Sequence, residues 1–131
     1  MQFTLDARAG VNLIRAYSPR ELTVGARTLT ASCIVSADTL ISKWRPASLA
    51  ALLPEDLAPL LALEPEIVLI GAMGERALSS PVRAAFGARC IAVEVMDLGA
   101  ACRTFNILVQ EERRVAAALF LKGESPLQKA T

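Results

Sequence analysis

The first part of the chain alternates apolar and polar positions, which is the pattern of strands with one buried face. Residues 22–24 alternate in this way before Gly25, and residues 28–33 continue the alternation after it. Alternation with a period of two on both sides of a glycine predicts an antiparallel β-hairpin that turns at Gly25. We also expect a strand over 12–17 and a short strand over 39–41.

The rest of the chain alternates helix signals with short, continuously apolar runs. The predicted helices cover 54–62, 80–86 and 97–111, and the predicted strands cover 67–70, 90–95 and 115–121. Apolar runs of strand length predict strands that are buried on both faces. Strands that alternate with helices predict a parallel sheet with helices on both sides.

These elements predict an α/β fold in one domain over 1–131. We expect a three-layer α/β/α sandwich with a mostly parallel core sheet, joined by an N-terminal antiparallel β-hairpin. Residues 122–131 contain glycine, serine and proline and are expected to form a loose tail.

Composition excludes several classes of protein. Hydrophobic residues make up 53% of the chain and charged residues 21%, which is typical of a globular domain. The net charge of +1 gives no basic face for nucleic acid. Mean hydropathy is high at +0.42, but the longest apolar run, 115–121, is too short to span a membrane. The excess apolarity indicates either buried strands or an uncovered patch that binds a partner.

Histidine is absent, which excludes Ser-His-Asp and Cys-His catalysis within this chain and removes the commonest ligand of catalytic zinc. Three cysteines, Cys33, Cys90 and Cys102, are too widely spaced for a zinc or redox motif. A reducing compartment with mostly buried thiols is expected. We therefore assign no catalytic residue, metal or cofactor.

The ends of two predicted strands hold the candidate binding residues. In parallel α/β sheets, sites form outside the carboxyl ends of the strands. Gly71 and Gly74 follow one strand, and Met96 and Asp97 follow the next, so these residues are expected to border one crevice. The glycine spacing matches no phosphate-binding motif. A tight turn is therefore preferred over a phosphate cradle for the two glycines.

Asp97 stands at the start of the helix predicted over 97–111. Its carboxylate is expected to cap this helix by accepting from the backbone amide of Gly99 or Ala100, which is preferred over a role in ligand binding. Cys102 falls on the apolar stripe of the same helix and is interpreted as a core residue.

Arg103 and Asn106 fall on another face of this helix. Arg103 is expected to pair with Glu94 or Glu75, and the alternative is that its guanidinium group binds a carboxylate or phosphate of a ligand. The candidate binding residues are Gly71, Gly74, Glu94, Met96, Asp97, Arg103 and Asn106.

Trp44 and Arg45 are the candidate interface residues, because tryptophan and arginine are enriched at binding hot spots. Packing of Trp44 in the core or against the hairpin is the preferred alternative.

Residues 91–121 read IAVEVMDLGAACRTFNILVQEERRVAAALFL and resemble the Mth938-like or DUF498 family, whose members share a run like E-x-MDT-xAACRTYN followed by RRVAAAL. Leu98 and Phe105 replace a threonine and a tyrosine of that pattern, and Ala72-Met73 stands in the family's Gly-Thr-Gly loop. The resemblance implies a three-layer fold with a β-hammerhead-like hairpin and no established enzyme activity. It also implies kinship with mitochondrial assembly factors for respiratory complex I.

The sequence supports two hypotheses for the function of the protein. The leading hypothesis is a non-enzymatic binding module that assists assembly of a membrane-associated or respiratory complex, with protein partners and with homo-oligomers as a further option. The alternative is an enzyme or small-ligand-binding protein that uses the crevice of Gly71, Gly74, Glu94, Asp97 and Arg103. The N-terminus has no secretory or transit signal, so a bacterial cytoplasmic protein is expected, with peripheral attachment to the inner membrane as an option.

Overall fold

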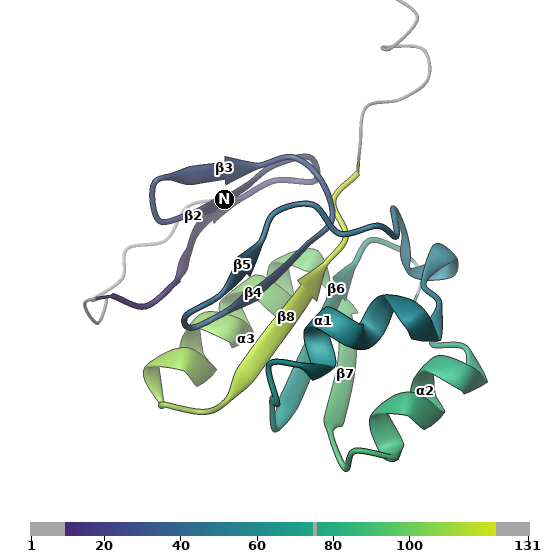
Figure 1. The fold of residues 1–131 in the computed structure, drawn as a ribbon. Helices are drawn as coiled ribbons and strands as arrows, with labels where there is room; N and C mark the ends of the chain where they lie inside the picture. Colours follow the sequence, from purple (N-terminus) through teal and green to yellow (C-terminus); the bar gives the residue numbers. More distant parts are fainter. Residues whose placement is uncertain (1–9, 75, 123–131) are drawn as a thin grey trace, which may run out of the picture.

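The computed structural model of the chain describes residues 10–74 and 76–122, which form two β-sheets and three α-helices (Figure 1). The strands are β1 (Ile14–Tyr17), β2 (Leu22–Val24), β3 (Arg27–Leu29), β4 (Cys33–Ser36), β5 (Leu40–Ile41), β6 (Ile67–Ala72), β7 (Ala92–Asp97) and β8 (Val115–Leu119). The helices are α1 (Ala58–Leu61), α2 (Ser80–Gly87) and α3 (Leu98–Gln110), with 3₁₀ turns η1 (Leu49–Ala51) and η2 (Pro54–Leu57).

The larger sheet has five strands in the order β5-β4-β8-β6-β7. β8, β6 and β7 run parallel to one another, as expected for strands that are separated by helices. β4 pairs antiparallel with both β8 and β5. The parallel core is therefore confirmed for three strands. The sheet as a whole is mixed rather than mostly parallel, because the first part of the chain contributes β4 and β5 to one edge.

The predicted hairpin at Gly25 is confirmed, and it belongs to a three-stranded antiparallel sheet in the order β1-β2-β3. Gly25 has a φ of +59° and is the first of two turn residues between β2 and β3, where a type II′ turn needs positive φ. The single strand predicted over 28–33 is wrong, because β3 and β4 belong to different sheets. The chain leaves the smaller sheet after Leu29, and the carbonyl oxygen of Ser32 accepts from the backbone amide of Trp44 at 2.9 Å.

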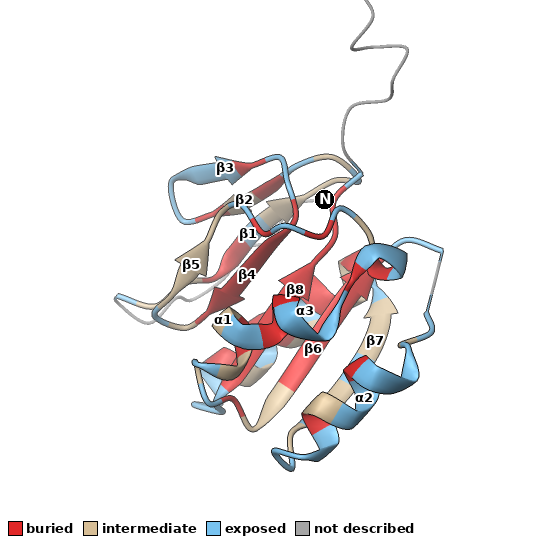
Figure 2. Ribbon diagram, turned by 45° about the vertical axis from the view of Figure 1, so that its right-hand side comes forward, coloured by how far each residue is buried: buried red, intermediate tan, exposed pale blue. Residues whose placement is uncertain are grey.

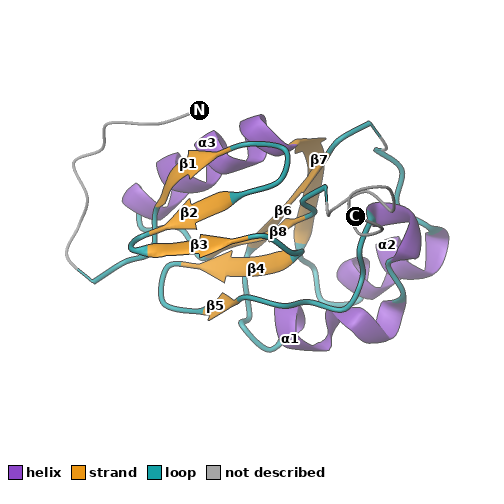
Figure 3. Ribbon diagram, turned by 90° about the horizontal axis from the view of Figure 1, so that it is seen from above, coloured by secondary structure: helices purple, strands orange, loops and turns teal. Residues whose placement is uncertain are grey.

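Helices cover both faces of the five-stranded sheet (Figures 2 and 3). α3 and the three-stranded sheet lie on one face, and α1 and α2 lie on the other. In the central strand β8, Ala117 and Leu119 pack into the core beneath α3, whereas Ala116 and Ala118 pack into the core beneath α1 and α2. The prediction of strands buried on both faces is therefore confirmed for this strand.

β7 differs from the other two parallel strands because it lies at the edge of the sheet. Its residues are exposed or half-buried, so the predicted burial on both faces is wrong for this strand. It also begins two residues later than the strand predicted over 90–95. Cys90 precedes it in an exposed turn with a φ of +56°, whereas Cys33 and Cys102 are buried as expected.

The approach of α3 to β6 depends on Gly71. A Cβ atom at this position would lie 2.9 Å from the Cβ of Ala101 and 2.9 Å from a methyl carbon of Leu119. These distances are shorter than real Cβ contacts, so a side chain at Gly71 would force α3 away from the sheet.

The helix predicted over 54–62 is confirmed in position, but its first turn is the 3₁₀ turn η2, and α1 continues from it. The helix predicted over 80–86 corresponds to α2, which Ser79 caps by accepting from the backbone amide of Val82 at 3.4 Å. Within 10–74 and 76–122, no helix has the length and apolarity that crossing a membrane requires.

Lys122 is the last described residue. Its backbone amide donates to the carbonyl oxygen of Pro19 at 2.7 Å, which joins the end of β8 to the loop between β1 and β2. The rest of the predicted tail, 123–131, lies outside the described residues.

Candidate functional site

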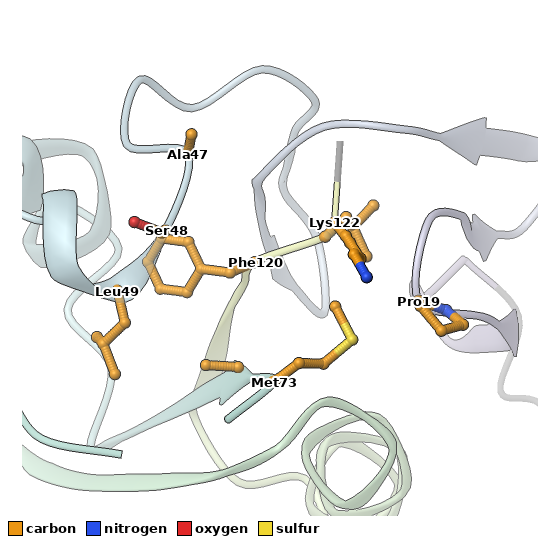
Figure 4. Close-up of a pocket in the computed structure, with 9 residues that line it drawn as sticks. Pro19, Ala47, Ser48, Leu49, Met73, Phe120 and Lys122 are labelled. Carbon is orange, nitrogen blue, oxygen red and sulfur yellow. The ribbon is translucent and has the colours of Figure 1, made fainter. Parts of the chain in front are cut away.

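A groove of about 500 Å³ lies beyond the carboxyl ends of β6 and β8 (Figure 4). We call it the strand-end groove. It is lined by Pro19, Ala47, Ser48, Leu49, Ala72, Met73, Phe120, Leu121 and Lys122. A crevice at this edge of the sheet agrees with the rule for parallel α/β folds. Its volume is typical of small-molecule pockets, which span about 300–1,000 Å³.

Phe120 forms the floor of the strand-end groove. Its backbone amide donates to the carbonyl oxygen of Gly71 at 2.9 Å, which extends the pairing of β8 with β6 by one residue. Its ring stacks on Trp44 with 5.5 Å between centroids. Trp44 is only 7% exposed, and its indole nitrogen donates to the carbonyl oxygen of Asp56 at 2.9 Å. Trp44 therefore supports the floor from within the protein, as the core-packing alternative describes.

The second candidate interface residue, Arg45, holds the wall of the groove. Its Nε donates to a carboxylate oxygen of Asp56 at 2.6 Å, and its Nη2 donates to the carbonyl oxygen of Ala51 at 2.7 Å. The other Asp56 oxygen accepts from Nη2 of Arg45 and from the backbone amide of Leu53 at 2.9 Å. The hydrogen bond from Arg45 lowers the pKa of the Asp56 carboxyl. We call this arrangement the Arg45–Asp56 clamp; it fixes the segment that carries Ser48 and Leu49.

A smaller cavity of about 160 Å³ adjoins the groove. It is lined by Tyr17, Ser18, Pro19, Met73, Asp97, Leu98 and Gly99 and shares Pro19 and Met73 with the larger one. Tyr17 lies against the first turn of α3, where a Cβ atom at Gly99 would be 2.6 Å from the tyrosine oxygen. The absence of a side chain at Gly99 therefore lets this wall form.

Asp97 is the one predicted binding residue that lines either cavity. Its side chain makes no capping hydrogen bond to α3, so the predicted cap is wrong. The Asp97 carboxylate instead accepts from Nη2 of Arg76 at 2.6 Å. Both side chains are more than half exposed, so water competes for this pair and its contribution to stability is small.

Arg103 does not pair with Glu94. Its Nη1 instead donates to the hydroxyl of Tyr17, the last residue of β1, at 2.7 Å. The other predicted partner, Glu75, lies outside the described residues. Glu94 itself is exposed on β7.

Asn106 is buried, with 3% of its surface exposed. Its side-chain oxygen accepts from the backbone amide of Ile14 at 2.8 Å, and its side-chain nitrogen donates to the Ile14 carbonyl at 2.9 Å. We call this pair of bonds the Asn106–Ile14 clamp. It uses both polar atoms of the Asn106 side chain to attach β1 to α3, which leaves no access for a ligand.

The remaining predicted residues, Gly71, Gly74 and Met96, line neither cavity. Gly71 is buried within β6, and Gly74 is an exposed turn residue with a φ of +91°, as the tight-turn interpretation requires. Met96 is half-buried and packs against the core beneath α3. The structure thus brings Asp97 to the strand ends and does not bring the other predicted residues into the two cavities.

Sequence reasoning missed the residues that form the groove. Pro19, Leu49, Phe120 and Lys122 come from three segments that are distant in the chain and share no motif. One signal was available: the apolar run over 115–121 extends two residues beyond β8, so its last side chains lie at a strand end.

Two of the three cysteines, Cys33 and Cys102, are buried in the core and line neither cavity. Burial raises the pKa of the Cys33 thiol to about 12, and burial followed by the proximity of Cys33 raises that of Cys102 to about 12. Neither thiol is a nucleophile at neutral pH. In the part of the chain that the structure describes, no three side chains of the metal-binding kinds gather as a cation site. The strand-end groove offers apolar walls, one hydroxyl and one ammonium group.

Comparison with known proteins identifies the fold and the family. The chain is 37% identical over 118 residues to NADH dehydrogenase [ubiquinone] 1 alpha subcomplex assembly factor 3 of Danio rerio, covering 87% of this chain and 66% of that protein. It therefore spans slightly less than two thirds of that relative's length.

Two solved structures have the same fold. A Xanthomonas campestris protein has a TM-score of 0.79 and 33% identity, with coverage of 94% of this chain and 96% of that one. A Mth938-like domain of Bordetella pertussis has a TM-score of 0.79 and 23% identity, with coverage of 98% of both chains. The family model DUF498/DUF598, described as a protein of unknown function, matches residues 14–120. The chain therefore belongs to the DUF498/DUF598 family and has the Mth938-like fold.

Proposed function

We propose that this chain is a non-enzymatic accessory module that binds protein subunits during assembly of a respiratory complex at the bacterial inner membrane. The observation that carries the proposal is the 37% identity to a protein named as an NADH dehydrogenase assembly factor. The match covers 87% of this chain, and the family model spans residues 14–120, which include both sheets and α3. An uncovered apolar groove at the strand ends is consistent with a binding role.

The test is deletion of the gene in the cell from which the chain comes. Assembled NADH dehydrogenase in native membranes should fall several-fold, with subassemblies accumulating, whereas succinate dehydrogenase serves as the unaffected reference. Expression of the wild-type chain should restore assembly. An unchanged amount of NADH dehydrogenase, or an equal loss of both enzymes, would contradict the proposal.

A direct measurement complements the deletion. The tagged chain is used to capture proteins from a mild detergent extract of native membranes, with the tag alone as control. Subunits of NADH dehydrogenase should be enriched by mass spectrometry over subunits of the reference enzyme. Equal recovery of both sets of subunits would count against a specific accessory role.

The second candidate function is the binding of a small ligand at the strand ends. The observation that favours it is the volume of the strand-end groove, about 500 Å³, at the edge of the sheet where α/β proteins bind ligands. The two functions are compatible, because a protein interface and a ligand pocket can lie on the same domain.

A further inference from the structure

We propose that the strand-end groove binds a small amphipathic carboxylate, with its apolar chain against Phe120, Leu49 and Met73 and its carboxylate at the ammonium group of Lys122. The inference rests on the second candidate function, ligand binding at the strand ends, and names the class of ligand and the residues that hold it. It is independent of any protein partner.

The floor of the groove is the open end of a hydrophobic core. Leu49, Ala72, Phe120 and Leu121 each have 3 to 5% of their surface exposed. The first three belong to the core beneath α1 and α2, and Leu121 belongs to the core beneath α3. Together with the more exposed Met73, these residues give the groove a largely apolar lining. Apolar groups of a ligand gain free energy there because they replace water against this surface.

Met73 provides an adaptable wall. It is 40% exposed and directly follows β6, and it contributes to both the groove and the adjoining smaller cavity. In Figure 4 its thioether lies between Phe120 on one side and Pro19 on the other. A flexible, polarisable methionine accommodates apolar ligands of different shape. The other large apolar side chains that are exposed in the described chain, Leu53 and Ile107, line neither cavity.

Lys122 determines the charge of the ligand. Of the described residues that line the groove, it is the one that carries a charge, and that charge is positive. Figure 4 places its nitrogen on the same side of the groove as the Met73 sulfur. Arg45, Arg76 and Arg113 each pair with an acidic side chain, whereas Lys122 has no such partner among the described residues. An anionic group at this rim would pair with the ammonium group of Lys122.

The apolar floor and the cation together select among ligand classes. An apolar amine would place a like charge against Lys122, and a sugar or a nucleotide would leave many polar groups against Phe120 and Leu49 without partners. A carboxylate with an aliphatic chain satisfies both features at once.

The experiment is a titration of the isotope-labelled full chain at pH 7, followed by amide chemical shifts in two-dimensional NMR. The probes are octanoate, hexanoate, 1-octanol and octylammonium, which vary the chain length and the head group separately. Octanoate should shift amide signals at Leu49, Met73, Phe120 and Lys122. It should bind about tenfold more tightly than hexanoate, because each buried methylene contributes up to about fourfold.

Paired variants locate the site. Lys122→Glu should weaken octanoate binding about fivefold, a loss that shrinks as salt is added, and Met73→Glu should abolish binding. Lys43→Glu and Ile107→Glu change an exposed lysine and an exposed apolar residue outside both cavities and should bind octanoate like the wild type. Thermal unfolding of each variant establishes that it is folded.

Three results would overturn the proposal. If octanol or octylammonium bound as tightly as octanoate, the groove would bind ligands but the carboxylate assignment would be wrong. If Lys122→Glu and Lys43→Glu weakened binding equally, the site would lie elsewhere. If no probe shifted the groove amides, both the inference and the second candidate function would fail, while the accessory role would still be judged by assembly in the cell.

Discussion

Two polar clamps hold the two faces of the five-stranded sheet, and they differ in charge and in burial. The Asn106–Ile14 clamp lies beneath the smaller sheet, is uncharged and is almost fully buried. The Arg45–Asp56 clamp lies on the opposite face, is ionic, and leaves the arginine side chain 57% exposed. Removing either clamp breaks hydrogen bonds. Only the loss of the Asn106–Ile14 clamp would leave backbone groups, the amide and carbonyl of Ile14, without access to water. We therefore expect the uncharged clamp to contribute more to stability.

The largest expected effect comes from Asn106→Leu. This change keeps a similar volume but leaves the amide and carbonyl of Ile14 buried without partners, at a cost of about 3 kcal/mol in the free energy of unfolding. Urea unfolding measures the loss, and hydrogen exchange should show β1 and β2 opening before the larger sheet. The adjacent exposed variant Ile107→Ala should cost less than about 0.5 kcal/mol. Equal losses in the two variants would contradict the clamp.

The next effect concerns the close packing on the same face. Gly71→Ala should destabilise the protein by about 2 kcal/mol, because the new methyl group meets Ala101 and Leu119 at 2.9 Å. Gly87→Ala is the matched control, since nothing lies within 4 Å of a Cβ atom there. Thermal unfolding should place the Gly87 variant at or above the wild type. A Gly71 variant as stable as the wild type would show that α3 adjusts without cost.

The charged clamp should give a smaller loss that depends on pH. Asp56→Ala should cost about 1 kcal/mol near neutral pH, because it removes the hydrogen bonds that this carboxylate accepts from Arg45 and from the backbone amide of Leu53. Because Arg45 lowers the pKa of Asp56 from its ordinary value of 3.8, the stabilisation is present above pH 3.8 and is lost as the pH falls through the lower folded-state pKa.

Thermal unfolding of the wild type and of Asp56→Ala between pH 7 and pH 2 tests whether the stabilisation by Asp56 is lost as the pH falls. The two stabilities should converge at the acidic end, whereas the gap between the wild type and Asn106→Leu should persist, because asparagine does not titrate. A gap for Asp56→Ala that stays constant over this range would contradict the ionic clamp.

The smallest effect is expected for Asp97→Asn. The Arg76–Asp97 pair is exposed on both sides, so its loss should change the free energy of unfolding by less than about 0.5 kcal/mol. Urea unfolding in low and high salt is the measurement. If Asp97→Asn lost as much stability as Asp56→Ala, solvent exposure would not explain the difference between the Arg76–Asp97 and Arg45–Asp56 pairs.

The elements of the fold were largely predictable, because they depend on local signals. The apolar runs indicated β6 and β8, the alternation around Gly25 indicated the hairpin, and Ser80 with Pro81 marks the start of α2. The partners of polar side chains were not predictable. Asn106 and Ile14 are 92 residues apart, and their contact depends on where β1 crosses α3.

The sequence pointed to the edge of the sheet where the strand-end groove lies, but not to the residues that line it. The rule for parallel sheets pointed to the carboxyl ends of the strands, where the strand-end groove lies. Two of the residues named there, Gly71 and Asn106, instead make contacts that hold α3 to β6 and β1. Leu49 reaches the groove because Arg45 and Asp56 fix its loop, and Lys122 reaches it because β8 ends there. Neither position has a sequence signal that distinguishes it from an ordinary loop residue.

The position of β8 has a consequence for how the chain folds during synthesis. β8 is the last strand of the described chain, but it lies between β4 and β6 in the middle of the larger sheet. Until residues 115–119 have left the ribosome, β4 and β6 have no strand to join them, and each half of the sheet has an open edge. A nascent chain that stops before β8 therefore exposes apolar edges that recruit chaperones or aggregate. The domain should reach its protease-resistant state in a single late step rather than gradually from its N-terminus.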